Sequence, residues 1–146
     1  LYSNRSPTAN ERELAAERVP LDSLLAQADH VVLVLPYSPA THHLIGEREL
    51  GRMQPHATLV NIARGGIVDD AALVRALRAG RPAAAGLDVF ENEPALNPDL
   101  LSLPNVALTP HIGSATRSSR VGMAMLAAEN LLAFAAGQPL CTPVSR

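Results

Sequence analysis

Four short apolar runs, separated by helical patterns, limit what this sequence can fold into more than any other feature. They occupy residues 31–36, 58–62, 83–89 and 106–109. The first run is continuous and rich in valine, which is typical of a strand buried on both faces of a sheet. Strand-like runs that alternate with helical segments predict an α/β fold with a parallel sheet.

Helix signals lie between and after these runs. One helix is predicted at Asp22, which has the side chain of an N-terminal cap, and a second from Asp69 to Gly80. The longest spans residues 116–136 and stops at Gly137, a residue type favoured just beyond helix ends. Apolar residues surround more than one side of this helix, so we expect it to pack against more than this domain alone.

Composition narrows the class of protein and its partners. The 146 residues, 47% hydrophobic and 18% charged, suit one globular domain. The net charge is -2, and the 12 basic residues, all Arg, are spread along the chain, which argues against nucleic-acid or anionic-membrane partners. No run is long enough to span a bilayer and no secretory signal opens the chain, so a cytoplasmic protein is expected. The lone Cys141 leaves no internal disulfide and no cysteine metal cluster, and we expect no metal site.

The first residues carry a turn but no glycine-rich segment. Leu1 and Tyr2 have the pattern of a strand end, a polar turn follows at 3–7, and none of the nine glycines precedes Gly46. A doubly wound dinucleotide-binding domain begins with a strand, a glycine-rich turn and a helix. We therefore expect a Rossmann-type doubly wound parallel sheet whose first βα unit is missing from this chain.

An arginine follows the second predicted strand, at the end of a sheet where ligands bind in parallel α/β folds. Arg64 stands before Gly65 and Gly66, which would let a ligand approach the backbone. Its guanidinium could hold a carboxylate through two parallel hydrogen bonds. The alternative is an ion pair with Asp69, and spacing alone does not decide between them.

Carboxylates and a histidine follow the next two strands. Asp88, Glu91 and Glu93 could orient a histidine or bind an amide, although a solvated loop is the commoner case. His111 lies between a proline and Ile112-Gly113 and is a candidate general acid or base, although a lone loop histidine is more often structural. The other four histidines, His30, His42, His43 and His56, are interpreted as having no function.

A polar turn after the first strand end bears on the cofactor. If that strand is the second of a dinucleotide fold, Asn4, Arg5 and Ser6 face the adenosine ribose. An acidic residue there would bond the 2′-hydroxyl, whereas an arginine and a hydroxyl accommodate a 2′-phosphate. The turn therefore favours NADPH over NADH, the alternative being an ordinary polar turn.

Taken in order, these segments resemble the nucleotide-binding domain of the D-isomer-specific 2-hydroxyacid dehydrogenases. The resemblance covers nearly the whole chain with matching spacing. The turn at 4–6 and the Ser-Ala-Thr that follows Gly113 most resemble the glyoxylate/hydroxypyruvate reductase and 2-ketogluconate reductase branch. The matching segments are 35–36 with Thr41 and 44–45, then 61–65, 68–69, 85–94 and 108–116.

The resemblance implies a catalytic trio. Arg64 would bind the carboxylate and carbonyl oxygen of a 2-keto acid, His111 would give its proton to that oxygen, and Glu93 would accept a hydrogen bond from the imidazole. Asp88 would bond the nicotinamide carboxamide. The other cofactor contacts that the resemblance implies are Asn4, Arg5, Ser6, Leu35, Pro36, Thr41, Ile62, Ala63, Arg64, His111, Gly113 and Ser114.

The implied reaction is hydride transfer between NADPH, or else NADH, and glyoxylate, hydroxypyruvate or 2-ketogluconate to give a D-2-hydroxy acid. Residues 1–114 would form a partial NAD(P)-binding Rossmann domain, and 115–146 a helix and tail packed towards a substrate domain. The family also implies a homodimer. Because the G-x-G-x-x-G turn and the substrate domain are not among these residues, we expect the chain alone to be inactive and to bind dinucleotide poorly.

Two alternatives stay open at this point. The first is NAD-dependent oxidation of a D-2-hydroxy acid or of D-3-phosphoglycerate, against which the lack of an acid at 4–6 argues. The second is a non-catalytic dinucleotide-sensing or interaction module on the same domain. The presence of Arg64, Glu93 and His111 together argues against the second.

Overall fold

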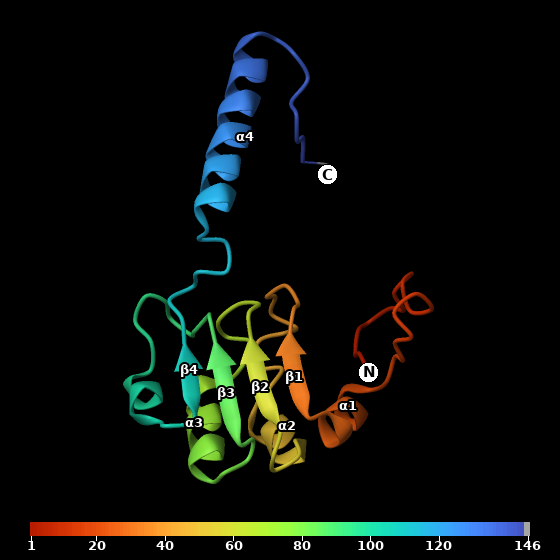
Figure 1. The fold of residues 1–146 in the computed structure, drawn as a ribbon, viewed down its shortest axis with the longest axis vertical. Helices are drawn as coiled ribbons and strands as arrows, with labels where there is room; N and C mark the ends of the chain where they lie inside the picture. The colour runs from red at the N-terminus through yellow and green to blue at the C-terminus, as the bar shows by residue number, and fades with distance from the viewer. Residues whose placement is uncertain (145–146) are drawn as a thin grey trace. The chain divides into compact units, whose positions relative to one another are not determined.

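The computed structural model describes residues 1–144 as two compact units, Leu1–Pro110 and a second that begins at His111 (Figure 1). The first unit holds the sheet and the shorter helices, and the second holds one long helix. In chain order the elements are α1 (Leu21–Gln27), β1 (His30–Leu33), α2 (Glu47–Arg52), β2 (Thr58–Asn61), α3 (Asp70–Arg78), β3 (Ala84–Leu87), the 3-10 helix η1 (Pro98–Ser102), β4 (Val106–Leu108) and α4 (Arg117–Ala135).

The strands form one parallel sheet in the order β1-β2-β3-β4. Val31 pairs with Leu59 and Leu59 with Ala85, so alternate side chains line up across the sheet. Each strand is shorter than the run that predicted it, and β1 ends at Leu33 although the apolar run continues to residue 36. The parallel α/β arrangement predicted from the sequence is confirmed.

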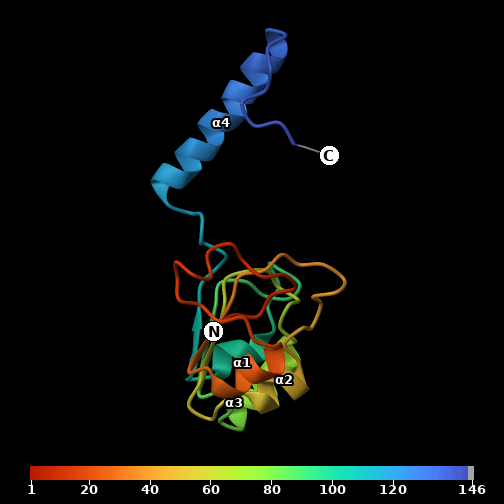
Figure 2. The same cartoon turned by 90° about the vertical axis from the view of Figure 1, so that its right-hand side faces the viewer.

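The helices of the first unit cover one face of this sheet. α1 packs beside α2 and α2 beside α3, and all three lie on the same side of the strands (Figure 2). Val31, Leu59 and Ala85 point towards them and are at most 5% exposed, whereas Val32 is 52% exposed. The expectation that the run at 31–36 is buried on both faces is wrong for this unit, because none of its helices packs on the second face.

Local chemistry explains where α3 begins and ends. The Asp69 carboxylate accepts a hydrogen bond from the Ala72 N–H (2.9 Å) and so provides an acceptor for one of the N–H groups that lack a partner at a helix start. Leu73 and Leu77 are buried on one side of the helix. Gly80 follows with a φ of 76°, in the left-handed region that glycine adopts most readily. The helix predicted from Asp69 to Gly80 is confirmed.

Two other helices differ from the sequence expectations. α1 begins after Pro20, so Asp22 lies in its first turn and is not the cap; there its charge still favours the helix through the positive end of the helix dipole. α2 was not expected, because its six residues bury a single large apolar side chain, Leu50. One buried residue produces no periodicity that a sequence pattern could reveal.

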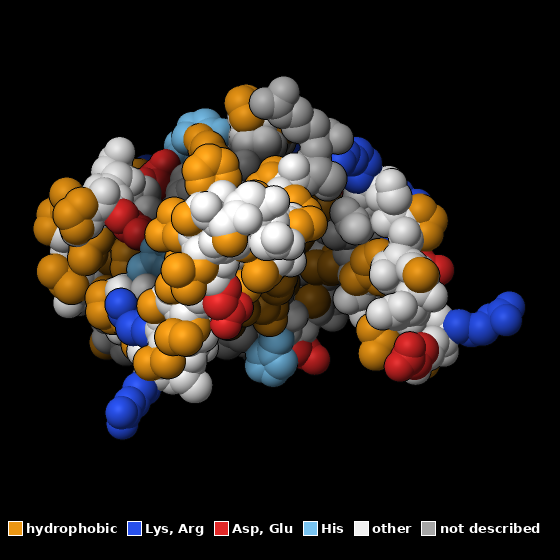
Figure 3. Space-filling model, turned by 90° about the horizontal axis from the view of Figure 1, so that it is seen from above, with side chains coloured by type: hydrophobic (Ala, Val, Ile, Leu, Met, Phe, Trp, Pro, Cys, Tyr) orange, Lys and Arg blue, Asp and Glu red, His pale blue; other side chains and the backbone are white. Residues whose placement is uncertain are grey.

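The second unit contains α4, which starts after the cap Thr116 and is followed by Gly137 at a φ of 65°, as predicted. None of its residues is buried in the described chain, and apolar side chains such as Met125, Leu132 and Phe134 are more than half exposed. No helix among residues 1–144 is long and apolar enough to cross a membrane. The space-filling view shows hydrophobic side chains exposed over much of the face that is drawn (Figure 3).

The fully buried position of Leu73 predicts a large loss of stability on truncation. Leu73→Ala should lower the free energy of unfolding by about 2–5 kcal/mol, because it removes apolar contacts and leaves a cavity. Arg75→Ala, on the exposed side of the same helix, should have a much smaller effect. Urea unfolding followed by circular dichroism measures both, and equal midpoints for the two variants would contradict the packing described.

Candidate active site

The loops that follow β2 and β3 touch each other at the carboxyl edge of the sheet. A Cβ added at Gly65 would lie 1.7 Å from the carbonyl oxygen of Phe90 and 2.4 Å from its carbonyl carbon. Only a residue without a side chain fits there. Because Gly65 follows Arg64 and Phe90 lies close to Glu93 in the chain, this contact brings the two loops that carry the predicted site together.

Buried Asn61 fixes the backbone around Arg64. Its side-chain oxygen accepts from the Ala63 N–H (3.1 Å) and its side-chain nitrogen donates to the Arg64 carbonyl (3.1 Å). The Arg64 guanidinium donates to the Ala63 carbonyl (2.6 Å) and pairs with no carboxylate among residues 1–144. Asp69 instead caps α3, so the alternative in which Arg64 is neutralised by Asp69 is not observed.

The Asp88 and Glu93 carboxylates after β3 each accept a hydrogen bond from the protein, although residues 92–95, including Glu93, are exposed. The Glu93 Oε1 accepts from the Phe90 N–H (2.9 Å). Asp88 is 9% exposed and accepts from the Thr109 hydroxyl (2.6 Å), while its own N–H donates to the Asn61 carbonyl (3.0 Å). Asp88 therefore joins the ends of β2, β3 and β4.

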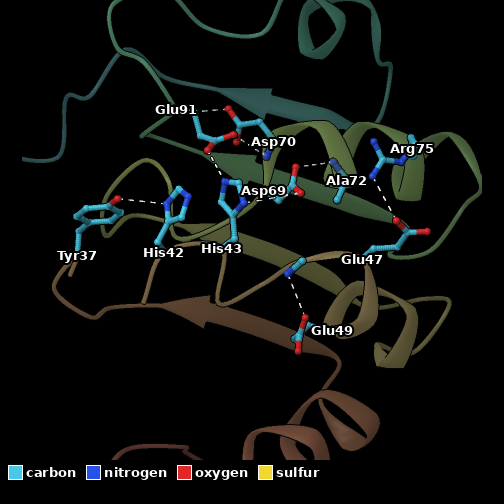
Figure 4. A network of polar contacts seen from close by, with 11 residues as sticks. Tyr37, His42, His43, Glu47, Glu49, Asp69, Asp70, Ala72, Arg75 and Glu91 are labelled. Atoms are coloured by element: carbon cyan, nitrogen blue, oxygen red, sulfur yellow. Dashed lines mark hydrogen bonds and ion pairs between the residues drawn. The ribbon is translucent and has the colours of Figure 1, made fainter. Parts of the chain in front are cut away.

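A third carboxylate in this loop belongs to a network that the sequence did not reveal (Figure 4). Glu91 Oε1 lies 2.5 Å from His43 Nε2, and Glu91 Oε2 accepts from the Asp70 N–H (3.2 Å). The hydrogen bond to Glu91 raises the pKa of His43 above its ordinary value. Burial raises the pKa of Asp70, which is 4% exposed, to about 6. His43 and Glu91 are 48 positions apart, so no local pattern connects them.

The loop after β1 carries three of the predicted cofactor contacts. The Thr41 hydroxyl donates a hydrogen bond to the Pro36 carbonyl and accepts one from the Ser38 N–H (2.7 Å). These bonds connect the two ends of the loop. Leu35 is half-buried. In the neighbouring loop Ile62 is 54% exposed and Ala63 is buried. Because the strands are parallel, both loops lie at the same edge of the sheet as Arg64.

The predicted ribose-binding turn is held by an arginine from another segment. Arg18 donates to the Asn4 carbonyl (3.0 Å) and to the Arg5 carbonyl (2.8 Å), and the Asn4 side chain accepts from the Arg5 N–H (2.8 Å). Tyr2 forms an isolated parallel bridge with Arg18. The side chains of Arg5 and Ser6 are exposed.

His111 is the first residue of the second unit. It is exposed and has a φ of 52°, an uncommon backbone conformation for a residue with a side chain. Gly113 and Ser114 follow it, in the turn before α4. The meeting of His111 with Arg64 and Glu93 stays a prediction, as does the domain boundary after residue 114.

A parallel α/β unit whose loops bring glycines, carboxylates and an arginine to the carboxyl edge of the sheet has the form of a nucleotide-binding domain. The chain carries the features of one particular family of such domains. Residues 1–113 match the family model described as D-isomer specific 2-hydroxyacid dehydrogenase, NAD binding domain, and the chain belongs to that family.

Named relatives agree with this assignment. The chain is 54% identical over 147 residues to a glyoxylate reductase of Thermococcus onnurineus, covering 100% of this chain and 44% of that protein. The solved structure of the TT0316 protein of Thermus thermophilus aligns with a TM-score of 0.90 and 45% identity, over 99% of this chain and 45% of that one. An NADPH-dependent glyoxylate/hydroxypyruvate reductase of Sinorhizobium meliloti, solved with NADP and malonate, aligns with a TM-score of 0.89 and 38% identity, over 99% and 44%. The chain thus spans less than half the length of these relatives.

The contact between Gly65 and Phe90 predicts a position-specific effect of a single methyl group. Gly65→Ala should force the two loops apart and lower the free energy of unfolding by about 1–3 kcal/mol. Gly51→Ala is the matched control, because a Cβ there meets nothing within 4 Å and lies inside α2. It should be neutral or stabilising. Thermal unfolding of both variants measures the difference, and similar shifts would rule out the close approach.

Proposed function

We propose that this chain is the part of a 2-keto acid reductase that orients substrate and nicotinamide cofactor, and that the parent protein reduces glyoxylate or hydroxypyruvate to a D-2-hydroxy acid. The exposed Arg64 guanidinium, placed at the carboxyl edge beside the loop of Glu93 and without a carboxylate partner among residues 1–144, carries this proposal. The names of the Thermococcus and Sinorhizobium relatives support the substrate class.

Arg64 suits the anionic half of a keto acid. A guanidinium presents two parallel N–H donors in a plane, which matches a carboxylate, and it cannot lose its charge at neutral pH. Its position after β2 is fixed by the backbone hydrogen bonds of Asn61. Arg64 would therefore bind the substrate carboxylate and polarise the neighbouring carbonyl oxygen.

Reduction of that carbonyl requires a proton as well as a hydride. The hydride would come from the nicotinamide ring of the bound cofactor. His111 would donate its proton to the carbonyl oxygen as the C–H bond forms, and Glu93 would accept a hydrogen bond from the imidazole and favour its protonated form. A carboxylate accepts several hydrogen bonds, so this role is compatible with the bond between Glu93 and the Phe90 N–H.

The residues at the sheet edge fit a nicotinamide group. Asp88 is oriented by Thr109 and by its own N–H, and its carboxylate could accept a further bond from a carboxamide. The exposed Ile62 side chain offers an apolar surface next to it in the neighbouring loop. Together these groups would orient the ring against a substrate held by Arg64.

We further propose that NADPH is the preferred cofactor. Arg18 holds the backbone carbonyls of the turn at 4–6, while the Arg5 and Ser6 side chains are exposed. A guanidinium and a hydroxyl favour a 2′-phosphate over a 2′-hydroxyl. The Sinorhizobium relative, whose structure contains NADP, supports this assignment.

Replacing Arg64 tests the substrate role. In the full-length protein Arg64→Lys should lower kcat/KM for glyoxylate by about 100-fold, since the charge stays but the two-point geometry is lost. Arg78→Lys, at an exposed position near the end of α3 in the first unit, is the control and should leave kcat/KM near the unmodified value. Steady-state oxidation of NADPH, followed by its absorbance, measures the reaction. An unchanged kcat/KM for Arg64→Lys would refute the assignment.

Replacing Arg5 tests the cofactor preference. In the full-length protein Arg5→Ala should weaken NADPH binding by about tenfold or more, the value of a lost charge-assisted hydrogen bond, and leave NADH binding unaltered. Arg12→Ala removes the same charge from an exposed position in the same segment and serves as the control. Dissociation constants come from nucleotide fluorescence titration. Tighter binding of NADH than NADPH by the unmodified protein would favour the NAD-dependent alternative.

A further inference from the structure

The cluster around His43 has the composition of a metal site but not the geometry of one. Ligand atoms of His42, His43 and Glu91 lie within 4.8 Å of one another. The two imidazoles, however, are stacked, with ring centroids 3.9 Å apart and planes inclined by 23°. A metal ion lies in the plane of each imidazole that binds it, and nearly parallel planes do not converge on one ion. We therefore interpret the cluster through its hydrogen bonds.

These hydrogen bonds connect three segments of the first unit. His43 lies in the loop after β1, Asp70 is the first residue of α3, and Glu91 lies in the loop after β3. Glu91 Oε1 lies 2.5 Å from His43 Nε2, and Glu91 Oε2 accepts a hydrogen bond from the Asp70 N–H (3.2 Å). The Glu91 N–H in turn donates to Asp70 Oδ2 (3.1 Å). Glu91 is thus held by its backbone and by both side-chain oxygens (Figure 4).

Each end of this network is itself anchored. The His43 N–H donates to the Gly66 carbonyl (2.8 Å), which fixes the β1 loop against the loop of Arg64. Two residues further on, Ile45 bridges to Val68, so the contact continues along the chain. Asp70 is fixed as part of α3 and is almost completely buried. The three residues therefore link rigid parts of the unit to the one loop that contains Glu93.

The position of Glu91 determines what the network controls. Its neighbour Phe90 donates its N–H to Glu93 and places its carbonyl against Gly65, next to Arg64. A shift of Glu91 would move both of these contacts at once. We propose that His43 and Asp70 act through Glu91 as positioning residues, which set the loop of Glu93 against Arg64. This inference rests on the proposed function and adds residues that the resemblance does not assign.

Protonation of His43 should tune the network. Glu91 faces its Nε2, Asp69 lies 3.9 Å from its Nδ1, Asp70 adds negative charge nearby, and His42 covers one ring face. The pKa of His43 is raised above 6.5, chiefly by its hydrogen bond to Glu91. Because the pKa of His43 is higher in the folded than in the unfolded protein, protonated His43 stabilises the fold. This stabilisation is fully present below pH 6.5 and is lost as the pH rises through the pKa of His43 in the folded protein.

The pKa of Asp70 is also raised, from its ordinary value of 3.8 to about 6, so the folded protein holds the Asp70 proton more tightly than the unfolded chain does. The stability of the fold therefore falls as the pH rises from 3.8 to about 6. The two groups act in the same direction. Only the shift of His43 comes chiefly from a bond within the network, since the Glu91 N–H lowers the pKa of Asp70, so deprotonation of His43 is the change that should loosen the network as the pH rises. Removing the titration of His43 while keeping a hydrogen-bond donor should flatten the upper part of this dependence.

The test compares two histidine–carboxylate pairs in the full-length protein. His43→Ala should lower kcat for glyoxylate reduction by about tenfold, the order expected when a supporting group lets catalytic residues shift. His43→Gln keeps a donor and should recover most of that loss, with a flatter alkaline limb of the pH–kcat profile. The control is His56→Ala, because His56 pairs with Asp29 at 2.6 Å before β2, at the opposite end of the strand, and should leave kcat unchanged.

Structural readouts separate this inference from the proposed function. Backbone amides of Asp70 and Glu91 should exchange hydrogen faster in His43→Ala than in His56→Ala. In Glu91→Gln the imidazole pKa of His43, measured by NMR, should fall towards its ordinary value. A protein without reductase activity would refute the proposed function and leave these two readouts to decide the network. Equal kcat and equal amide exchange in the two alanine variants would overturn the positioning role.

Discussion

The close approach of the Gly65 backbone to the Phe90 carbonyl is the constraint on which the candidate site depends. Two loops leave neighbouring parallel strands, and each carries a group needed for the proposed chemistry. They meet only because one of them has no side chain at the point of contact. The hydrogen bonds of Asn61 on one side and of Glu93 on the other then fix the backbone around that point.

Several negative charges must lie close together for this arrangement to hold. Asp70 and Glu91 exchange side-chain-to-backbone hydrogen bonds, so each carboxylate receives a peptide N–H while it lies near the other. His43 adds a titratable donor to the same pair. The raised pKa of Asp70, caused first by burial and then partly by Glu91, shows that the compensation is incomplete. Burial therefore disfavours the charged form of Asp70, a residue that we propose positions the loop of Glu93.

The sequence predicts the elements well where one residue type carries the signal. The valine-rich run places β1, and Asp69 with Gly80 limits α3, because caps and β-branched runs act locally. The sequence does not predict α2, which buries a single large side chain. It also does not predict the exposure of Val32, which depends on whether a helix covers the second face of the sheet. Arg64, Asp88 and Glu93 could be proposed from strand ends and from the family resemblance. His43 could not, since its partner Glu91 is distant in sequence and only the parallel order of β1, β2 and β3 brings them together.

Exposed and buried polar residues differ in their hydrogen-bond partners in this site. Arg64 is exposed, as its proposed role of binding a substrate carboxylate requires. Asn61, Asp70 and Asp88 are buried, and each directs its hydrogen bonds to backbone groups or to a neighbouring hydroxyl. Buried polar groups with every partner in place hold a single geometry, since any other would leave an unsatisfied donor or acceptor. Buried polar groups thus hold the backbone that carries the exposed residues, and among them the family resemblance assigns a role to Asp88 but to neither Asn61 nor Asp70.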